Sequence, residues 1–442
     1  MTLSSLPELV AADVAADGVR IPPDVTVPLT PRVRALLDTA EMRRLAGISQ
    51  LGLVALVYPG ATHTRLEHSL GVYRLALRFL QRLQHDGRFA AAVTATDAAA
   101  FLAAALLHDV GHWAYCHPLE DMGLDILPRH ETLVHGVLTG GALATILDRD
   151  WHVSPRRVHE LIGGTATDPA GRILHSLLSG PIDVDKMDYL ARDSLHAGVP
   201  YGRHFDQDRL LASLCLDQTG TAVAITAKGR TAAELMVFAR YVMFSEVYWH
   251  HAVRAATAML QRAVWLVRPT VDAARLIRTD DRGFVDWLTA AAAGTPAEPL
   301  VAGLFGTVRR LFKRAGSFDA LDAPTVHAAL AGLSYPAMAR VSARLAETLS
   351  ARLGRPIAAA TLIVDAPPAA REVEFRLQVR EPAAAGHAWR NLADLSPVVR
   401  SLAHEQFDNL VKRVRVFAPP DEAEAIAGCP DLESLLVAAA RD

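Results

Sequence analysis

Two adjacent residues, His108 and Asp109, carry the strongest sign of chemistry in this sequence of 442 residues. An imidazole and a carboxylate on one short piece of backbone suit the borderline or hard divalent metals that activate water. Two neighbouring side chains cannot close a metal site by themselves. The candidates for the remaining ligands are His68, in the segment HTRLEHSL (63–70), and Asp185, in the segment IDVDKMDY (182–189).

The segment around His68 is predicted to be a buried helix. Residues 63–85 carry two neighbouring apolar stripes at helical spacing, and a helix that is apolar on two flanks is largely buried. We therefore expect His68 to point into the protein. The first stripe contains Leu66, Leu70, Tyr73, Leu77 and Leu80, and the second contains Val72, Leu75, Phe79 and Leu83.

The helix that carries His108 and Asp109 at its end is rich in alanine and leucine. Asp97 is placed to cap its amino-terminal end, and Gly111 is placed to terminate it. A metal at the end of such a buried helix would give Asp109 the charged partner that burial alone denies it.

The rest of the chain is predicted to be mainly α-helical, with a small α+β lobe at the carboxyl end. Helical segments are expected at residues 31–49, 135–147, 155–162 and 231–266, and the helix with Asp185 is expected to begin after Gly180-Pro181. Strands are expected at residues 221–227, 360–364, 373–379 and 411–417, and a loop or linker at residues 291–299.

A chain of this length exceeds one ordinary hydrophobic core. Its 51% content of hydrophobic residues favours packed cores over disorder. We expect four segments, with an amino-terminal extension at 1–30, the metal-binding core at 31–270, a helical extension at 271–354 and the α+β lobe at 355–442.

The net charge and the cysteine content argue against several classes of protein. A formal net charge of −3 gives no basic footprint of a dedicated nucleic-acid binder, so local basic residues must hold any anionic substrate. Cys116, Cys215 and Cys429 form no CxxC pair, which argues against a disulfide framework or a zinc ribbon. We find no signal peptide, and apolar runs such as 98–107 are too short to span a bilayer. We therefore expect a cytoplasmic protein.

The order and flanks of the candidate ligands resemble those of the HD-domain deoxynucleoside triphosphate (dNTP) triphosphohydrolases. Within that family the sequence is closer to the branch of the vertebrate enzyme that joins a sterile-alpha motif to an HD domain, although that extra motif is not recognisable here. The resemblance covers residues 31–265 well, and it returns more faintly at 407–416. Its most specific pieces are residues 50–52 (QLG), 58–61 (YPGA), 63–71, 107–112 and 183–193.

The resemblance implies that His68, His108, Asp109 and Asp185 hold a divalent metal and leave positions for a water or hydroxide and a phosphate oxygen. Such a metal supplies a nucleophile at neutral pH and polarises the phosphoryl group. Two histidines and two aspartates are compatible with Mn, Fe, Mg, Zn, Ni or Co.

The resemblance also implies the catalytic side chains. His112 and His117 would face the α-phosphate, with His117 as the general acid for the leaving 5′-oxygen. His130 and Glu120 would tune His117, because a nearby carboxylate favours the imidazolium. Glu120 stands where the family more often has aspartate.

Three basic residues, Arg65, Lys186 and Arg240, match phosphate-contacting positions of the family. Two departures bear on the distal phosphates. His251 stands in place of a phosphate-binding lysine, and Phe244 stands in place of a histidine. These departures imply a weaker hold on the distal phosphates.

The sugar and the base have matching positions as well. Gln50, with Leu51 beside it, and Asp193 match the residues that read the 3′-hydroxyl. Tyr189 matches the ring that crowds the 2′ position, which favours deoxyribose because an added hydroxyl would clash with it. Tyr248 would flank the base.

The regulatory guanine-nucleotide site of the family matches less well. Asp38 is present, but Arg43 and Ala46 replace a glutamine and an arginine, and no segment like Asp-Pro-x-His-Gly is recognisable near residues 23–24. Activation by a bound nucleotide, and a tetramer that depends on it, stay open. We expect a homo-oligomer of unspecified size.

Each of these residues also has an ordinary structural explanation. A buried His68 alone could be a satisfied core residue, and the three basic residues could form salt bridges. Three functions therefore stand beside one another. The first is hydrolysis of dNTPs to deoxynucleoside and inorganic triphosphate. The second is hydrolysis of other nucleotides, such as mono- or diphosphates or alarmones, and the third is nucleotide sensing with little turnover.

Overall fold

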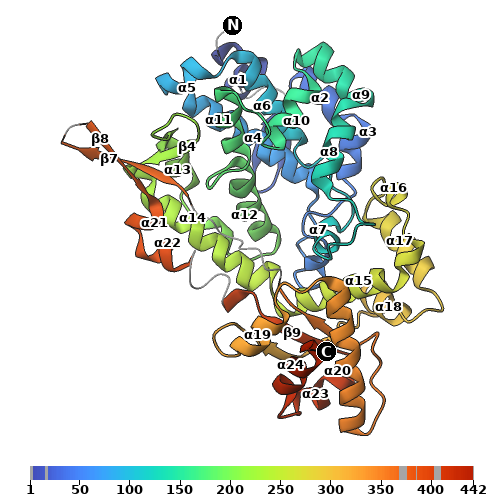
Figure 1. The fold of residues 1–442 in the computed structure, drawn as a ribbon. Coiled ribbons are helices and arrows are strands. Elements are labelled where there is room, and N and C mark those ends of the chain that lie inside the picture. The colour runs from blue at the N-terminus through green and yellow to red at the C-terminus, as the bar shows by residue number, and fades with distance from the viewer. Residues whose placement is uncertain (1–2, 15–17, 368–375, 385, 403–409, 442) are drawn as a thin grey trace.

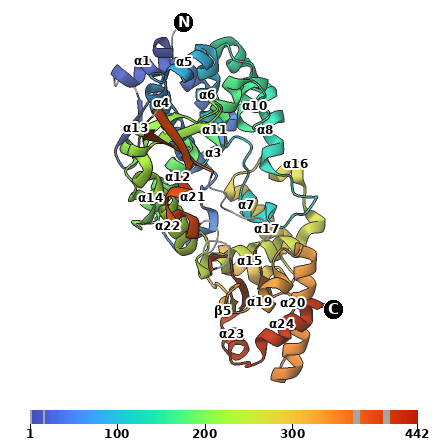
Figure 2. The same cartoon turned by 60° about the vertical axis from the view of Figure 1, so that its left-hand side comes forward.

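A large helical body and a smaller lobe make up the molecule in the computed structural model, which describes residues 3–14, 18–367, 376–384, 386–402 and 410–441. The lobe lies at the opposite end from the amino terminus and contains the carboxyl terminus (Figures 1 and 2). Helix α15 (His251–Val267) lies where the two meet. Buried apolar side chains form one large cluster in the body, a second around α15 and a third in the lobe.

The helical body confirms the prediction of a mainly α-helical fold. None of the helices among the described residues combines the length and the apolar character that crossing a membrane requires. The helices up to residue 196 are α1 (Pro7–Val14), α2 (Pro31–Leu37), α3 (Ala40–Leu45), α4 (Arg65–Leu83), α5 (Gly87–Ala92), α6 (Ala95–Leu107), α7 (Cys116–Glu120), α8 (His130–Thr139), α9 (Gly141–Ile146), α10 (Pro155–Ile162), α11 (Pro169–Leu178) and α12 (Val184–His196). Those that follow are α13 (Gln207–Ser213), α14 (Arg230–Met243), α15, α16 (Ala273–Leu276), α17 (Asp281–Ala292), α18 (Glu298–Phe305), α19 (Pro324–Leu330), α20 (Tyr335–Leu353), α21 (Leu392–Leu395), α22 (Pro397–Ser401), α23 (Pro420–Ala427) and α24 (Leu432–Arg441).

Three helices expected from the sequence are each broken. The segment 135–147 divides into α8 and α9, because Gly140 between them is extended. The segment 31–49 divides into α2 and α3 because the hydroxyl of Thr39 accepts a hydrogen bond from the Met42 amide and starts a new helix. The segment 231–266 divides into α14, a π-helical turn (Phe244–Tyr248) and α15. There His250 caps α15 by accepting from the amide of Ala252.

The two ends of α6 also differ from expectation. Thr94, rather than Asp97, is the capping residue, and Asp97 returns a hydrogen bond to the amide of Thr94 in a capping box. The helix ends at Leu107, so Gly111 does not terminate it. Gly111 instead lies in the following turn, where a Cβ atom would lie 2.5 Å from the carbonyl oxygen of His130.

The strands form three small sheets. The hairpin of β1 (Gly18–Ile21) and β2 (Val25–Pro28) stands alone, and β4 (Val223–Thr226) confirms the strand expected at 221–227. A four-stranded sheet has the order β3 (Leu214–Leu216), β4, β7 (Gln378–Ala383) and β8 (Gly386–Asn391), and a three-stranded sheet has the order β5 (Lys313–Phe318), β9 (Val414–Ala418) and β6 (Ile363–Asp365).

The chain returns to the helical body late in the sequence. Strand β7 pairs in parallel with β4, so the β7–β8 hairpin extends a sheet of the body before the chain re-enters the lobe at β9 (Figure 1). Strands β6 and β9 lie near the expected segments 360–364 and 411–417, whereas β1, β2, β3, β5 and β8 were not anticipated. Part of the strand expected at 373–379 falls outside the described residues. The division into four segments stays a prediction.

Candidate active site

The four predicted metal ligands lie together at the ends of three helices. His68 is on the first turn of α4, His108 caps the end of α6, Asp109 follows it, and Asp185 is on the first turn of α12. The Nε2 atoms of His68 and His108 are 3.3 Å apart. An oxygen of Asp185 lies 2.9 Å from the first and 3.8 Å from the second, and an oxygen of Asp109 lies 3.4 Å from the second.

These distances suit a divalent metal. Donor atoms about 2.1 Å from one ion lie roughly 3 Å from one another. The other ring nitrogen of each histidine is held from outside, since His68 Nδ1 lies 2.9 Å from Asp188 and His108 Nδ1 lies 2.9 Å from the carbonyl of Ala105. Such outer contacts fix the imidazole so that Nε2 faces the metal. His68, His108 and Asp185 therefore form a cluster that can hold a divalent ion, whose identity the ligands do not specify. Asp109 lies beside this cluster, 3.4 Å from His108 Nε2.

Charge at the centre also favours a cation. Burial alone would lower the pKa of His68, but hydrogen bonds to Asp185 and Asp188 outweigh it and raise this pKa to about 10. Burial would raise the pKa of Asp109, yet the charges of His112, His108 and Arg65 hold it well below its usual range. The carboxylates are thus ionised around a position that attracts positive charge.

Asp188 is the outer support of this centre, and the sequence did not indicate a role for it. Both of its oxygens accept hydrogen bonds of 2.8 Å from the guanidinium of Arg192, while one of them also faces His68. Arg192 in turn donates to Glu67. Gly71 leaves room for this network, because a Cβ atom there would overlap Asp188 and Arg192.

The predicted catalytic histidines lie next to the metal ligands. His112 Nδ1 is 3.1 Å from the same Asp109 oxygen that faces His108, and its Nε2 is 3.2 Å from His117 Nε2. The rings of His112 and His130 have centroids 3.9 Å apart. Glu120 lies 2.8 Å from His130 Nδ1 and also accepts from the His130 amide. Asp109 thus links the metal ligands to the histidine cluster.

Burial and positive charge lower the pKa of two of these imidazoles, those of His112 and His117. Burial and the nearby Arg65 lower the pKa of His117 to about 3, although Glu120 opposes the change. Burial and Arg65 also lower the pKa of His112 well below its usual value. Burial would raise the pKa of Glu120, but its hydrogen bonds and charge contact with His130 lower it.

A cavity of about 380 Å³ opens onto both groups of side chains. Of the predicted substrate-binding residues it includes Gln50, Arg65 and Tyr189. Arg65 donates to Asp109 over 2.9 Å, so its charge stays beside the metal ligands. The lining residues are Gln50, Arg65, His68, His108, Asp109, His112, His117, His130, Glu131, Val134, His159, Ile162, Gly163, Leu178, Ser179, Asp185 and Tyr189.

The other predicted substrate residues do not line this cavity. The ammonium of Lys186 is bound 2.6 Å from the buried carboxylate of Asp183, which caps α12. Asp193 faces His63 Nε2 over 2.9 Å and accepts from the hydroxyl of Tyr248 over 2.6 Å. Leu51 packs against the core of the body.

Arg240 is the remaining predicted phosphate contact. It lies on the last turn of α14, and its guanidinium carbon is 5.6 Å from the ring centre of Phe244. Its charge acts to lower the pKa of both Tyr189 and Tyr248, although burial and nearby acidic groups raise each of them overall. The helix that carries Arg240 therefore brings its charge close to the two tyrosines expected at the sugar and the base.

Several side chains at the site carried no signal in the sequence. His159 of α10 and Ser179 after α11 line the cavity, and the ring of His159 packs edge-on against that of His135. Arg44, on the last turn of α3, donates to the carbonyls of Val110 (2.9 Å) and His112 (2.7 Å). The two contacts of Arg44 join segments that are more than 60 residues apart, so no local pattern could reveal them.

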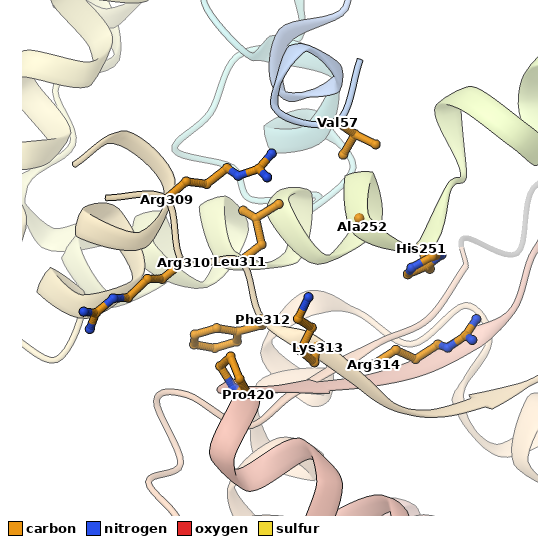
Figure 3. Close-up of a pocket in the computed structure, with 10 residues that line it drawn as sticks. All are labelled: Val57, His251, Ala252, Arg309, Arg310, Leu311, Phe312, Lys313, Arg314 and Pro420. Atoms are coloured by element: carbon orange, nitrogen blue, oxygen red, sulfur yellow. The ribbon is translucent and has the colours of Figure 1, made fainter. Parts of the chain in front are cut away.

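A second cavity, of about 560 Å³, lies between the start of α15 and the segment that leads into β5 (Figure 3). Its wall carries Arg309 and Arg310 on that segment, Lys313 and Arg314 at the start of β5, and His251 on α15. It shares no lining residue with the cavity at the metal ligands. Positive charge therefore gathers at the junction of body and lobe as well as at Arg65.

Two family models match most of the chain. The HD domain matches residues 65–193, and the HD-associated region matches residues 205–436, which is more than half of the sequence. Among curated proteins, YwfO of Bacillus subtilis, described as uncharacterized, is 36% identical over 51% of this chain and 50% of its own length. The deoxynucleoside triphosphate triphosphohydrolase SAMHD1 of Gallus gallus is 29% identical over 54% of this chain and 43% of its own length.

Solved structures agree on the fold. A hypothetical protein from Aquifex aeolicus superposes with a TM-score of 0.69 at 24% identity, over 93% of this chain and 99% of its own. A phosphohydrolase from Bacteroides thetaiotaomicron superposes with a TM-score of 0.68 at 21% identity, over 91% of this chain and 99% of its own. The chain spans about half the length of the curated relatives that it matches. With His68, His108 and Asp185 in one cluster and Asp109 beside it, the chain belongs to the HD-domain family, as a member that carries an HD-associated region after its HD domain.

Proposed function

We propose that this chain hydrolyses dNTPs at the α-phosphate to give deoxynucleoside and inorganic triphosphate. One observation carries the proposal: a single cavity is lined by the four metal ligands, by His112, His117 and His130, and by two residues expected at the sugar. Relatives that bear the name deoxynucleoside triphosphate triphosphohydrolase support it. A divalent metal in this centre would activate water and polarise the phosphoryl group.

The side chains around the centre have complementary tasks in this reaction. Arg65, held by Asp109, offers a fixed positive charge to a phosphate oxygen. His117 would give a proton to the leaving 5′-oxygen, which requires the imidazolium. Burial and the charge of Arg65 lower the pKa of His117. The negative charges of a bound triphosphate would raise this pKa again, so binding of the substrate would favour the protonated form of His117.

An unpaired acceptor supports recognition of the sugar. Among the described residues, the buried Oε1 atom of Gln50 has no hydrogen-bond partner, and Gln50 lines the cavity. A buried acceptor without a partner is costly, and a hydroxyl donor would satisfy it. The 3′-hydroxyl of a deoxynucleotide is such a donor, and Tyr189 on the same wall would crowd a 2′-hydroxyl.

The remaining substrate contacts need movement from their present partners. Lys186 would have to leave Asp183 to reach a phosphate, and Asp193 would have to share its oxygens between Tyr248 and the sugar. The cytoplasmic location and the homo-oligomer that the sequence suggests form part of the same proposal.

A product assay tests the proposal directly. The full chain would be incubated with Mn²⁺ or Mg²⁺ and each dNTP, singly and in mixtures, and the products separated by anion exchange. We expect deoxynucleoside and intact triphosphate in equal amounts. Asp109→Ala should abolish both, whereas Asp208→Asn, which changes an exposed carboxylate on α13, should leave the rate unchanged. Orthophosphate or pyrophosphate in place of triphosphate would contradict the proposal.

A second candidate is hydrolysis of nucleotides with fewer phosphates. It is favoured by the ion pair of Lys186 with Asp183 and by His251 and Phe244, which stand where the resemblance expects phosphate contacts. The same assay separates the two, because this candidate releases orthophosphate from mono- or diphosphates and leaves dNTPs intact.

A further inference from the structure

A second group of metal-binding side chains lies beside the first. The donor atoms of His112, Cys116, His117 and His130 all lie within 4.8 Å of one another. Among them, the Nε2 atoms of His112 and His117 are 3.2 Å apart. In a tetrahedral zinc site, nitrogen donors lie roughly 3.3 Å from one another and about 3.6 Å from a thiolate sulfur. Movements of roughly an ångström would therefore close this group around one ion.

The surroundings of the group resemble the outer contacts of a metal site. His130 has a carboxylate hydrogen-bonded at Nδ1, since Glu120 lies 2.8 Å from it. Asp109 lies 3.1 Å from His112 Nδ1, but the two atoms are not in hydrogen-bonding geometry. A carboxylate at Nδ1 orients an imidazole so that Nε2 points at a metal and increases its basicity. The same arrangement holds His68, through Asp188, in the first centre.

The donor set selects a different kind of ion from the first centre. Cys116 is buried and lies on α7 next to His117, and a thiolate with three imidazoles suits Zn²⁺ and similar thiophilic ions. The first centre offers oxygen in place of sulfur, through Asp109 and Asp185. The four residues of the second group also lack any carboxylate that would favour Mg²⁺ or Mn²⁺.

We propose that His112, Cys116, His117 and His130 form a second metal site, which binds Zn²⁺ or a like ion and inhibits the enzyme. An ion there would occupy the nitrogen lone pairs of His112 and His117. Neither could then contact the α-phosphate or carry a proton to the leaving oxygen. Metal binding at this site does not depend on the substrate, whereas the inhibition rests on the proposed function.

Cobalt titration of the full, metal-stripped chain tests the site without any substrate. Co²⁺ replaces Zn²⁺ in tetrahedral sites, and a thiolate ligand gives a near-ultraviolet charge-transfer band that nitrogen and oxygen ligands do not. We expect two equivalents of Co²⁺ to bind, with this band rising for one of them and disappearing when Zn²⁺ is added. A single equivalent, or a second one without the band, would overturn the proposal.

Variants assign each equivalent to its site. Cys116→Ser should abolish the band and lower the affinity for the second equivalent of Co²⁺ at least tenfold. If the serine variant folds poorly, His130→Gln takes its place and should lower the same affinity. Cys215→Ser changes a buried cysteine on β3 and should keep both equivalents. Asp185→Asn should lower the affinity for the first equivalent of Co²⁺ and keep the band. A band that survives Cys116→Ser, or is lost in Cys215→Ser, would refute the assignment.

Inhibition is measured separately, on whichever nucleotide the product assay identifies. Excess Zn²⁺ should lower the rate of the wild-type chain, and Cys116→Ser should be at least tenfold less sensitive relative to its own zinc-free rate. Equal sensitivity would refute the inhibitory role. If no nucleotide is hydrolysed, the proposed function fails while the cobalt titration still decides the metal site.

Discussion

At the scale of single residues, Asp188 shows how a side chain outside the ligand set can determine the metal centre. It is buried, faces His68 Nδ1 over 2.9 Å and is itself fixed by two hydrogen bonds from Arg192. The contact selects the tautomer of His68 that presents an unprotonated Nε2 to the ion. Removing the negative charge of Asp188 should therefore weaken the binding of the metal without removing a ligand.

We expect Asp188→Asn to lower the affinity for the activating metal by roughly 10- to 100-fold, the usual effect of losing such an outer contact. The loss would be measured by competition with a fluorescent chelator, and excess metal should restore much of any lost activity. Asp208→Asn provides a matched change on an exposed carboxylate and should leave the affinity unchanged. Unaltered metal affinity in Asp188→Asn would show that Asp188 does not orient His68.

At the scale of elements, the turn after α6 must place Asp109 and His112 correctly, and it is held from α3. The guanidinium of Arg44 donates to the carbonyls of Val110 and His112, one on either side of Gly111. Gly111 lets α8 approach closely, since a Cβ would meet the carbonyl of His130. Thus α3 and α8 hold the turn between them, and neither supplies a ligand of the first metal centre.

We expect Arg44→Met, which keeps an unbranched apolar stem, to lower kcat at least tenfold with little change in metal affinity. Displacement of a reacting group by about 1 Å can cost about 100-fold. The free energy of unfolding should fall by about 1.5–3 kcal/mol through the lost charged hydrogen bonds. Steady-state kinetics and urea unfolding measure both effects.

Arg43→Met is the matched control for this change. Arg43 is the neighbouring exposed residue on the same helix, so both kcat and stability should stay close to those of the wild type. Equal kinetics in the two variants would contradict a positioning role for Arg44.

Elements with a strong local pattern were predictable from the sequence. The helix expected at 63–85 is α4 (Arg65–Leu83), and the one expected at 155–162 is α10, because apolar periodicity is a local property. The breaks at Thr39 and His250 were missed, since each depends on one side chain capturing one amide. Strand β8 was missed because its burial is slight and its pairing is with β7.

The candidate site divides in the same way. The order His68, His108-Asp109, Asp185 is visible along the chain, and the structure brings these side chains to one cavity. The roles assigned to them stay predictions. Asp188 and Arg44 act through contacts between segments far apart in sequence, so only the folded chain reveals them. The partners of Cys116 lie within residues 112–130, so the close spacing of these histidines and the cysteine was a signal that the sequence did carry.

At the scale of the whole molecule, α15 connects the lobe to the segment that carries His117. Arg254, near its start, forms a buried ion pair with Asp365 on β6 of the lobe, with distances of 2.5 and 3.1 Å. Further along α15, Gln261 donates over 2.6 Å to the carbonyl of Pro118, which follows His117. Arg415 of β9 reaches the carbonyl of Trp249 just before α15. The helix is therefore anchored by the lobe near its start and contacts the segment that carries His117 further along.

Loss of the Arg254–Asp365 pair should loosen this anchor. In Asp365→Asn the guanidinium of Arg254 stays buried without its anion, and breaking one partner of a buried ion pair costs about 3–5 kcal/mol. Urea unfolding should record a loss of this size, and hydrogen exchange should accelerate in both β6 and the first turns of α15. Asp431→Asn removes a partly exposed partner of Arg352 within the lobe and should cost less than about 1 kcal/mol. If exchange in α15 is unchanged while β6 loosens, the lobe does not anchor the helix, and the two bodies are held together by apolar packing around α15 instead.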